Sequence, residues 1–398
     1  MTEAPRVLHV ITGLGVGGAE HQLRLLLRHL PARCDVVTLT NAGPVADGLR
    51  ADGVRVTDLK MRGNRDLAAL PRLTRLIRSG GYDLVHTHLY RACVYGRVAA
   101  RLAGVRAVVA TEHSLGAAEI EGRPLTAGTR ALYRATERLG TATVAVSATV
   151  AERLAAWGVP GPRIHTVPNG VDAERFRFDA GARAAVRASL GVSPGTYAVG
   201  GVGRLVPGKR FDDLVRAVAA VVADGRDAVL LIAGDGPERG ALERLAARLG
   251  VAERVRLLGE CGQEEGAGAP TVAELLGALD LFVSTSVEEA FGLAVVEALA
   301  AGLPVLYRTC PAVEDLPSHE APDARRVPAG SHDALVRALR EQVVAGARRS
   351  AVAPVVRRYA MARTAEQVMD VYGRALAAEG CAGRPREHHS HSIEGASR

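Results

Sequence analysis

The sequence lacks several features that would reveal its compartment or class at once. It has no run of eighteen apolar residues, so no transmembrane helix is predicted. Its first apolar run, residues 7–12, is broken by Gly13 too early to serve as a signal peptide, and we expect a cytoplasmic protein. Its 5 cysteines are scattered without a CxxC pair, which indicates neither a disulfide framework nor a zinc site.

Aromatic residues and lysines are also scarce. Only 4% of residues are aromatic, which leaves few platforms for stacking nucleobases, although the formal net charge is +7. The basic residues are spread over the predicted helices, so phosphorylated substrates or an anionic membrane face explain the charge as well as nucleic acid does. We therefore predict no nucleic-acid partner. Lys60 and Lys209 are the only lysines, and Lys209 falls in a glycine-rich loop.

The order of apolar runs and helical patterns predicts the architecture. A length of 398 residues suits two domains of ordinary size. A strand, a glycine loop and an amphipathic helix begin at residue 7, and the same series begins again at residue 197. We predict an α/β protein of two Rossmann-like domains that face each other across a central cleft. The predicted parts are an N-terminal domain over 1–172, a turn-rich linker over 173–195, a C-terminal domain over 196–355, a last helix over 356–380 and a disordered tail over 381–398.

The first glycine loop, GLGVGGAE over 13–20, does not have the GxGxxG spacing of a dinucleotide site. Its glycines still allow the backbone to approach a ligand closely, and Gly17 and Gly18 are the candidates for that contact. A simple tight turn is the alternative.

A basic amphipathic helix is expected between Arg62 and Arg78, with leucines along one side and arginines elsewhere. Such a helix can rest peripherally on an anionic membrane, or it can be a domain helix with a solvated face. Both interpretations stay open at this point.

Histidines gather at the ends of two predicted strands. His86 and His88 lie on one face of the strand over 82–89, but no third ligand stands at suitable spacing, so no metal site is predicted. His113 lies at the C-terminal end of the strand over 105–114, on a loop edge with polar neighbours, where ligands of open parallel sheets collect. It is a candidate for the reacting centre, with a structural histidine as the alternative. Residues 115–128 show no periodicity and are expected to form a substrate loop.

The second glycine loop carries two cations, Arg204 and Lys209, around a Pro-Gly turn. Two cations at the start of a helix can hold a diphosphate through charge and directional donors. The spacing does not fit a Walker A loop, and a surface-charged turn is the alternative.

The stretch from Ser284 to Val305 predicts a strand end, an acidic loop, a glycine turn and a helix that stops at Gly302. Glu289 is expected in the loop and Glu297 within the helix, roughly 10 Å apart at the rise of an α-helix. The amides of Ala290 to Leu293 are expected to favour an anion at the helix start. An ordinary amphipathic helix with solvated acids is the alternative.

Together these segments resemble the large retaining glycosyltransferase family with the GT-B fold. The resemblance covers about residues 5–380, and its most specific part is the pair Glu289 and Glu297, separated by seven residues. The supporting segments are GGAE (17–20), TEHS (111–114), VPNGVD (167–172), GVGRLVPGK (201–209), IAGDGPE (232–238) and EEAFGLAVVEALAAGLPV (288–305).

The resemblance implies an N-terminal acceptor domain and a C-terminal domain that binds a nucleotide sugar, with the last helix crossing back to the N-terminal domain. Arg204 and Lys209 would then hold the diphosphate, Glu297 would accept hydrogen bonds from the ribose, and Glu289 would contact the transferred sugar. The remaining implied contacts are the amides of Phe291, Gly292 and Leu293 at the donor, Gly17 and Gly18 at the donor phosphate or acceptor, and His113 near the reacting centre.

The implied reaction is transfer of a hexose-like unit from a UDP-sugar, favoured over a GDP-sugar, to a hydroxyl of a glycan, lipid-linked or secondary-metabolite acceptor. The configuration would be retained, without a metal or a cofactor other than the donor. Some features depart from the family pattern: Ala290 stands where glycine is common, Thr309-Cys310-Pro311 replaces a glycine pair, and the stretch 260–271 is long.

Three other functions remain open from the sequence. A nucleotide-sugar epimerase or phosphorylase would use the same fold. A dinucleotide-dependent oxidoreductase is disfavoured by the glycine spacing, and a nucleic-acid-binding protein is suggested by charge alone.

Overall fold

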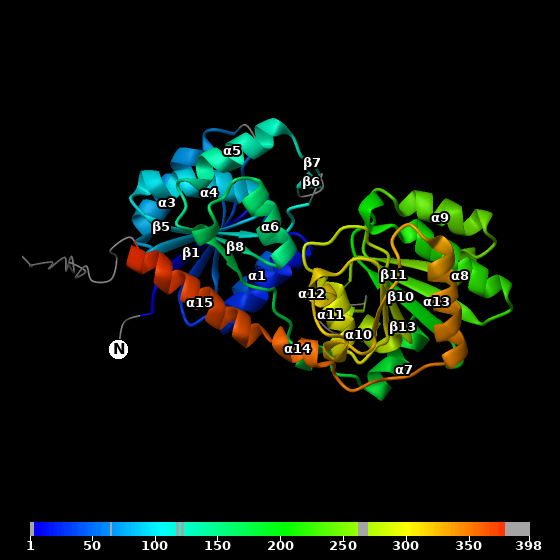
Figure 1. Ribbon diagram of the computed structural model, residues 1–398. Helices are drawn as coiled ribbons and strands as arrows, with labels where there is room; N and C mark the ends of the chain where they lie inside the picture. The colour runs from blue at the N-terminus through cyan, green and yellow to red at the C-terminus, as the bar shows by residue number, and fades with distance from the viewer. Residues whose placement is uncertain (1–3, 64–65, 117–118, 121–122, 262–269, 379–398) are drawn as a thin grey trace, which may run out of the picture.

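The computed structural model describes residues 4–63, 66–116, 119–120, 123–261 and 270–378. The tail expected over 381–398 and most of the loop expected over 262–270 lie outside the described residues. The described chain forms two lobes, each built on a parallel sheet with helices on both faces (Figure 1). The prediction of an α/β protein with two Rossmann-like domains is therefore confirmed.

The N-terminal sheet has 7 strands in the order β3-β2-β1-β4-β5-β8-β9, all parallel. The strands are β1 (Arg6–Ile11), β2 (Arg33–Thr38), β3 (Arg55–Asp58), β4 (Leu84–His88), β5 (Ala107–Glu112), β8 (Ala142–Ala145) and β9 (Ile164–Thr166). The helices of this lobe are α1 (Gly18–His29), α2 (Gly43–Ala51), α3 (Ala69–Gly80), α4 (Tyr90–Ala103), α5 (Ala127–Glu137) and α6 (Ala148–Ala156).

The C-terminal sheet has 6 parallel strands in the order β12-β11-β10-β13-β14-β15. They are β10 (Tyr197–Val202), β11 (Ala228–Ala233), β12 (Val255–Gly259), β13 (Leu281–Ser284), β14 (Val305–Tyr307) and β15 (Ala324–Arg326). The helices are α7 (Ala180–Ser189), α8 (Phe211–Ala223), α9 (Arg239–Arg248), α10 (Val272–Ala278), α11 (Leu293–Ala300), α12 (Pro311–Glu314), α13 (His332–Ala345) and α14 (Pro354–Arg358).

In each sheet, successive strands are added on one side of the first strand and then on its other side. The change occurs between β1 and β4 in the N-terminal sheet and between β10 and β13 in the C-terminal sheet. Ligands of doubly wound sheets bind at this switch point, at the carboxyl ends of the strands. The central strands are apolar because helices cover both of their faces, as β5 and β11 illustrate by being buried along their whole length. The loops after β1, β4, β10 and β13 therefore meet at the crevice of each sheet.

Two segments differ from the predicted loops. Within the expected linker, residues 180–189 form helix α7, whose Arg183 donates to Asp280 at 2.6 Å and so ties this segment to the C-terminal lobe. Within the expected substrate loop, β6 (Glu119–Ile120) and β7 (Arg123–Pro124) pair as a short antiparallel hairpin. Neither segment has the apolar periodicity that identifies longer elements.

The last helix, α15 (Met361–Ala378), lies along the N-terminal lobe, where it contacts β5 and α1 (Figure 1). The chain thus crosses between the lobes twice, and the two crossings run side by side. A β-bridge joins Val171 to Ala360, and the Gln22 amide of α1 exchanges two hydrogen bonds with Gly170, at 2.8 and 3.0 Å.

The basic helix α3 uses its apolar face inside the protein. Leu73 and Ile77 are fully buried in the N-terminal core, while Arg75 and Arg78 lie on the exposed side. This arrangement is that of a domain helix, and membrane association stays a prediction. Among the described residues, no helix combines the length and the apolar character that crossing a bilayer requires.

Candidate active site

Two loops of the C-terminal lobe meet at its switch point, one after β10 and one after β13. The Thr285 hydroxyl donates to the Lys209 carbonyl at 2.8 Å, and the Val287 amide donates to the Gly208 carbonyl at 3.1 Å. These bonds hold the two loops in register. The two sequence segments that carry the expected donor-binding residues are therefore neighbours in space.

Lys209 and Glu289 form an ion pair across these loops, with Nζ and Oε1 at 2.5 Å. Both side chains are partly open to solvent, at 26% and 18% exposure, so the pair lines an accessible surface rather than the core. A cation for an anionic group and an acceptor for hydroxyls thus stand side by side at the place where this fold binds ligands.

The start of α11 is shaped by Gly292, which caps the helix with a φ of +97°. A Cβ atom at this position would lie 2.4 Å from the Cys310 Sγ, so both the backbone angle and the space require glycine. The Phe291 side chain is buried and packs edge-on against Tyr359 at 5.0 Å, which leaves only its backbone to face a ligand. Ala290 and Leu293 flank this turn in partly buried positions.

Glu297 lies one turn further along α11, in a partly buried position. Burial raises the pKa of its carboxyl to about 7, and the positive charge of Arg175 opposes that rise. Arg175 belongs to a short 3₁₀ turn (Glu174–Phe176) in the crossing segment, and the sequence contained no signal for its role. Near neutral pH this acid is therefore divided between its charged and neutral forms.

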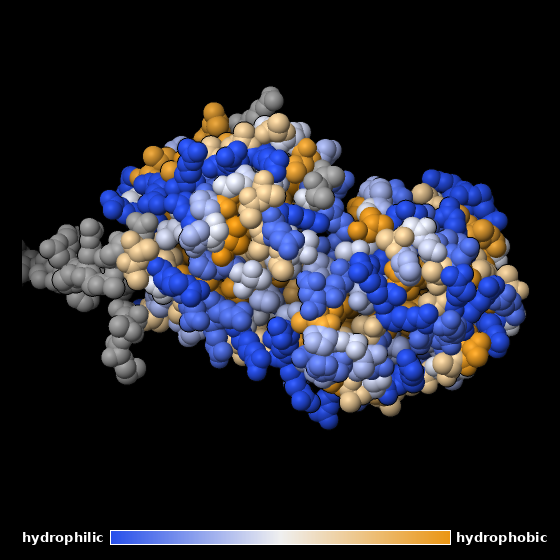
Figure 2. All heavy atoms as spheres, viewed as in Figure 1, coloured by the Kyte–Doolittle hydropathy of each residue, from blue (hydrophilic) through white to orange (hydrophobic). Residues whose placement is uncertain are grey.

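The N-terminal lobe contributes the start of α1, which faces the start of α11. A Cβ atom on Gly18 would lie 3.5 Å from the Leu293 Cδ1, so these two predicted residues lie close to each other across the lobes. The Glu20 carboxylate lies over Gly17, where it would approach a Cβ atom to 2.4 Å. In Figure 2 a notch separates the lobes on the face shown.

Glu20 also lies near Arg204, the other cation predicted to hold the diphosphate. Burial raises the pKa of Glu20, whereas its backbone hydrogen bond and the charge of Arg204 lower it. Arg204 itself is exposed, in the loop after β10. An acid of one lobe thus stands near a cation of the other, a contact that sequence analysis did not predict although Glu20 belongs to the GGAE segment.

A second contact between the lobes involves Glu288, the neighbour of Glu289. Its carboxylate pairs with Arg153 of α6 at 2.8 Å, and the same arginine donates to the Leu115 carbonyl at 2.7 Å. The loop after β5 is therefore joined to the acidic loop of the opposite lobe. Sequence analysis missed this pair because its members are far apart in the chain.

His113 stands at the carboxyl end of β5, among residues of the N-terminal lobe and α15. Its Nε2 is 3.1 Å from the Nδ1 of His88, and its Nδ1 is buried without a hydrogen-bond partner in the described structure. Burial lowers the pKa of His113 to about 4, so the ring is neutral at pH 7. It borders a cavity of about 30 Å³, whose polar lining includes Gln22, Thr111 and Asn169.

The predicted site residues thus fall into two groups. Lys209, Glu289 and the start of α11 form one surface of the C-terminal lobe, and Gly18 of the other lobe lies close to it. Arg204, in the same loop as Lys209, lies near enough to Glu20 for its charge to lower the pKa of that acid. His113 belongs to the N-terminal lobe and is held there by histidine neighbours. Because both groups lie at the carboxyl ends of their strands, the arrangement can bind an extended anionic ligand beside a second, hydroxyl-bearing one.

Comparisons with known proteins give a consistent result for both lobes. Residues 16–175 match the family model described as Glycosyltransferase Family 4, and residues 196–343 match the model described as Glycosyl transferases group 1. The chain is 33% identical to a D-inositol 3-phosphate glycosyltransferase of Saccharomonospora viridis over 333 residues, or 75% of this chain and 72% of that protein.

Two further similarities bear on the same point. A D-inositol 3-phosphate glycosyltransferase of Nocardia farcinica is 36% identical over 245 residues, which span 57% of this chain and 51% of that relative. Among solved structures, HepE of Anabaena in complex with UDP and glucose superposes with a TM-score of 0.79 at 19% identity, covering 93% of this chain and 99% of HepE. The latter similarity is one of fold.

Proposed function

Because this chain belongs to the glycosyltransferases that combine a Family 4 half with a group 1 half in the GT-B fold, we propose that it transfers a hexose from a UDP-sugar to a hydroxyl with retention of configuration. A GDP-sugar is the second choice of donor. The observation that carries the proposal is the Lys209–Glu289 pair at the switch point of the C-terminal sheet, opposite the start of α1.

The chemical difficulty of such a transfer is the negative charge that grows on the leaving diphosphate. Lys209 and Arg204 offer positive charge from the loop after β10, and the start of α11 offers amides beside the Lys209–Glu289 pair. Preorganised groups of this kind stabilise a transition state without having to reorganise. A diphosphate carries more charge than one carboxylate, so it is expected to displace Glu289 from Lys209. Glu289 is then free to accept hydrogen bonds from hydroxyls of the transferred sugar.

The acceptor side of the proposal rests on His113 and on the glycine loop of α1. A ring that is neutral at pH 7 acts as a hydrogen-bonding group rather than as a cationic acid, so His113 would orient a substrate oxygen. In the proposed front-face reaction the departing phosphate takes the proton of the acceptor hydroxyl. No metal is required in this scheme, because the protein cations take the place of one.

The first acceptors to test are cyclitols and their phosphates, since both relatives described above are named for inositol 3-phosphate. Purified protein is incubated with UDP-glucose or GDP-glucose and each acceptor, and the products are followed by proton NMR. The expected result is nucleotide release that depends on the acceptor, with an α-linked product from the α-linked donor. An altered sugar still attached to the nucleotide indicates an epimerase, and a sugar phosphate formed with inorganic phosphate indicates a phosphorylase.

Donor binding is expected to weaken as the pH falls, because the ribose hydroxyls would donate to an ionised Glu297. Burial holds its pKa near 7 in the free protein, so the anion is the major form at pH 8 and the minor form at pH 6. The Kd for UDP-glucose, measured by calorimetry, should therefore rise about tenfold between pH 8 and pH 6.

The matched control for this pH dependence is Glu297→Gln, which keeps the shape of the side chain and removes its titration. We expect weaker binding of UDP-glucose by this variant, at a Kd that changes little over the same range. UDP-glucose is used instead of UDP because its phosphates do not titrate there. An equal pH slope in the variant and the wild type would assign the dependence to another group.

A further inference from the structure

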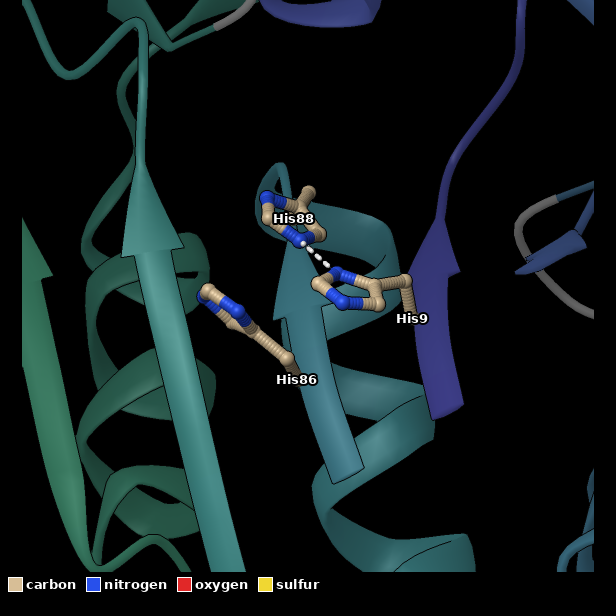
Figure 3. Close-up of side chains that lie close together, drawn as sticks. All are labelled: His9, His86 and His88. Carbon is tan, nitrogen blue, oxygen red and sulfur yellow. Dashed lines mark hydrogen bonds between the residues drawn. The ribbon is translucent and has the colours of Figure 1, made fainter. Parts of the chain in front are cut away.

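Three histidines from adjacent strands lie together beneath His113. His9 comes from β1, and His86 and His88 come from β4; all three are buried (Figure 3). The His9 Nδ1 is 3.0 Å from the His88 Nε2, and the His88 Nδ1 is 3.1 Å from the His113 Nε2. His9, His88 and His113 therefore form one hydrogen-bonded chain, which we call the histidine relay. It runs from the interior of the sheet to its carboxyl edge.

His86 supports the relay from the side. Its Nδ1 lies 2.7 Å from the Tyr372 hydroxyl of α15, and its Nε2 lies 2.7 Å from the Thr111 hydroxyl. Its ring packs against that of His88, with centroids 4.1 Å apart and planes tilted by 36°. The ligand nitrogens of His9, His86 and His88 lie within 4.8 Å of one another, but both nitrogens of His86 and of His88 already take part in hydrogen bonds that a metal would displace. The geometry favours a hydrogen-bond network over a metal centre.

The relay has a direction, because a neutral imidazole carries one N–H and one acceptor nitrogen. Burial lowers the pKa of His9 to about 3 and that of His113 to about 4, and it lowers the pKa of His88 strongly, so all three rings are neutral at pH 7. Only two arrangements satisfy both hydrogen bonds. In one, each ring donates towards His113, which then carries its proton on Nδ1. In the other, every proton lies on Nε2.

The two ends of the relay decide between these arrangements. The His9 Nε2 and the His113 Nδ1 are both buried without a hydrogen-bond partner in the described part of the protein. A buried N–H without an acceptor is rarer in proteins than an acceptor without a donor. His9 ends inside the sheet, whereas His113 borders the small cavity at the carboxyl edge, where water or a substrate oxygen can accept a hydrogen bond. The N–H therefore belongs at the His113 end.

We infer that His9 and His88 are positioning residues that hold His113 in the Nδ1–H tautomer and so present a hydrogen-bond donor to an oxygen of the sugar or of the acceptor. The role towards substrate rests on the proposed function, but the tautomer does not. Proteins commonly fix one nitrogen of a functional histidine through the bond made by the other, and here a second and a third imidazole provide that bond.

The experiment uses full-length protein with ¹⁵N-labelled histidine, and long-range ¹H–¹⁵N spectra report which nitrogen of His113 carries the proton. The signals are assigned with His113→Gln. We expect a protonated Nδ1 and an unprotonated Nε2 in the wild type at pH 7. This measurement needs neither substrate nor turnover, so it remains informative if the proposed reaction is wrong. A protonated Nε2 on His113 overturns the inference.

Two variants of His88 separate hydrogen bonding from packing. In His88→Asn the amide can still donate towards the His113 Nε2, whereas His88→Phe keeps a ring of similar size and loses the donor. We expect the asparagine variant to retain the Nδ1–H tautomer and most of kcat, and the phenylalanine variant to lose the single tautomer and about tenfold in kcat, as for one lost hydrogen bond. KM for the donor should change little.

If the role of His88 is only structural, the asparagine variant should lose more activity than the phenylalanine variant, because phenylalanine fills the space of the imidazole and asparagine leaves a gap. Thermal unfolding of both variants identifies any failure to fold, and the wild-type spectrum tests the inference if one variant is lost. Elemental analysis of the purified protein completes the test, since one equivalent of bound metal would overturn the relay in favour of a metal centre.

Discussion

Replacing Lys209 with alanine is expected to lower kcat for sugar transfer by at least about a hundredfold, as for the loss of one preorganised donor at a developing negative charge. The Lys209 ammonium stands next to Glu289 at the switch point, where the leaving diphosphate is proposed to bind. Stability should change by less than about 1 kcal/mol, because the ion pair is partly solvated. The loss is therefore catalytic and is measured as the initial rate of UDP release in a coupled assay.

Arg216→Ala is the matched control for this substitution. Arg216 lies on α8 of the same lobe, where it pairs with the partly exposed Asp212 one turn earlier, so its removal lowers the net charge equally without touching the proposed site. We expect wild-type turnover from this control. The proposal for the site would be wrong if Lys209→Ala turned over at the wild-type rate with every donor that the protein accepts.

The largest effect on stability is expected from Asp213→Ala. Asp213 lies in the first turn of α8, and its Oδ2 accepts from the Arg308 Nη1 at 2.6 Å and pairs with Arg210 at 3.0 Å. Arg308 is 1% exposed, and its Nε and Nη2 have no hydrogen-bond partner within the described structure. Removing the acid leaves a buried, unpaired guanidinium, which costs about 3–5 kcal/mol in the free energy of unfolding.

The neighbouring residue gives the control for this prediction. Asp212 forms pairs only partly screened from solvent, with Arg210 and Arg216, and Asp212→Ala should cost less than about 1 kcal/mol. Urea unfolding followed by circular dichroism measures both variants. Equal midpoints for the two would show that the buried pair contributes no more than an exposed one. Since α8 directly follows the Lys209 loop, donor binding should weaken in parallel in Asp213→Ala.

Much of the architecture could be predicted because it follows from local patterns. Apolar runs separated by amphipathic helices predict parallel sheets, and parallel strands place the loops after their carboxyl ends at one edge. Lys209 and Glu289 are 80 positions apart, yet each follows a central strand of the same sheet, so their meeting was predictable. The helix after Gly292 was also predictable, because its apolar pattern and its stop signal are local features of the sequence.

Contacts that depend on how the lobes and strands pack were not predictable. Arg153 meets Glu288 only because α6 of one lobe faces a loop of the other, and no local pattern encodes that distance. His9 reaches His88 through the register of β1 against β4. In the sequence alone His9 is an ordinary position of the first strand, and nothing there indicates that it belongs to the histidine relay. The burial of Phe291 against Tyr359 likewise depends on α14 returning beneath α11.

The return of α15 to the first lobe sets an order of events during synthesis. Tyr372 reaches His86 across 286 positions, and Val368 and Val371 complete the same apolar cluster as Val7 and Leu84. When residues 1–172 have been synthesised, α1 already covers part of this sheet face through Leu26 and its C-cap residue Leu30, but the part that α15 covers is still exposed. That part stays exposed while the entire second lobe is translated, so the lobe made first can complete its core only after the lobe made second.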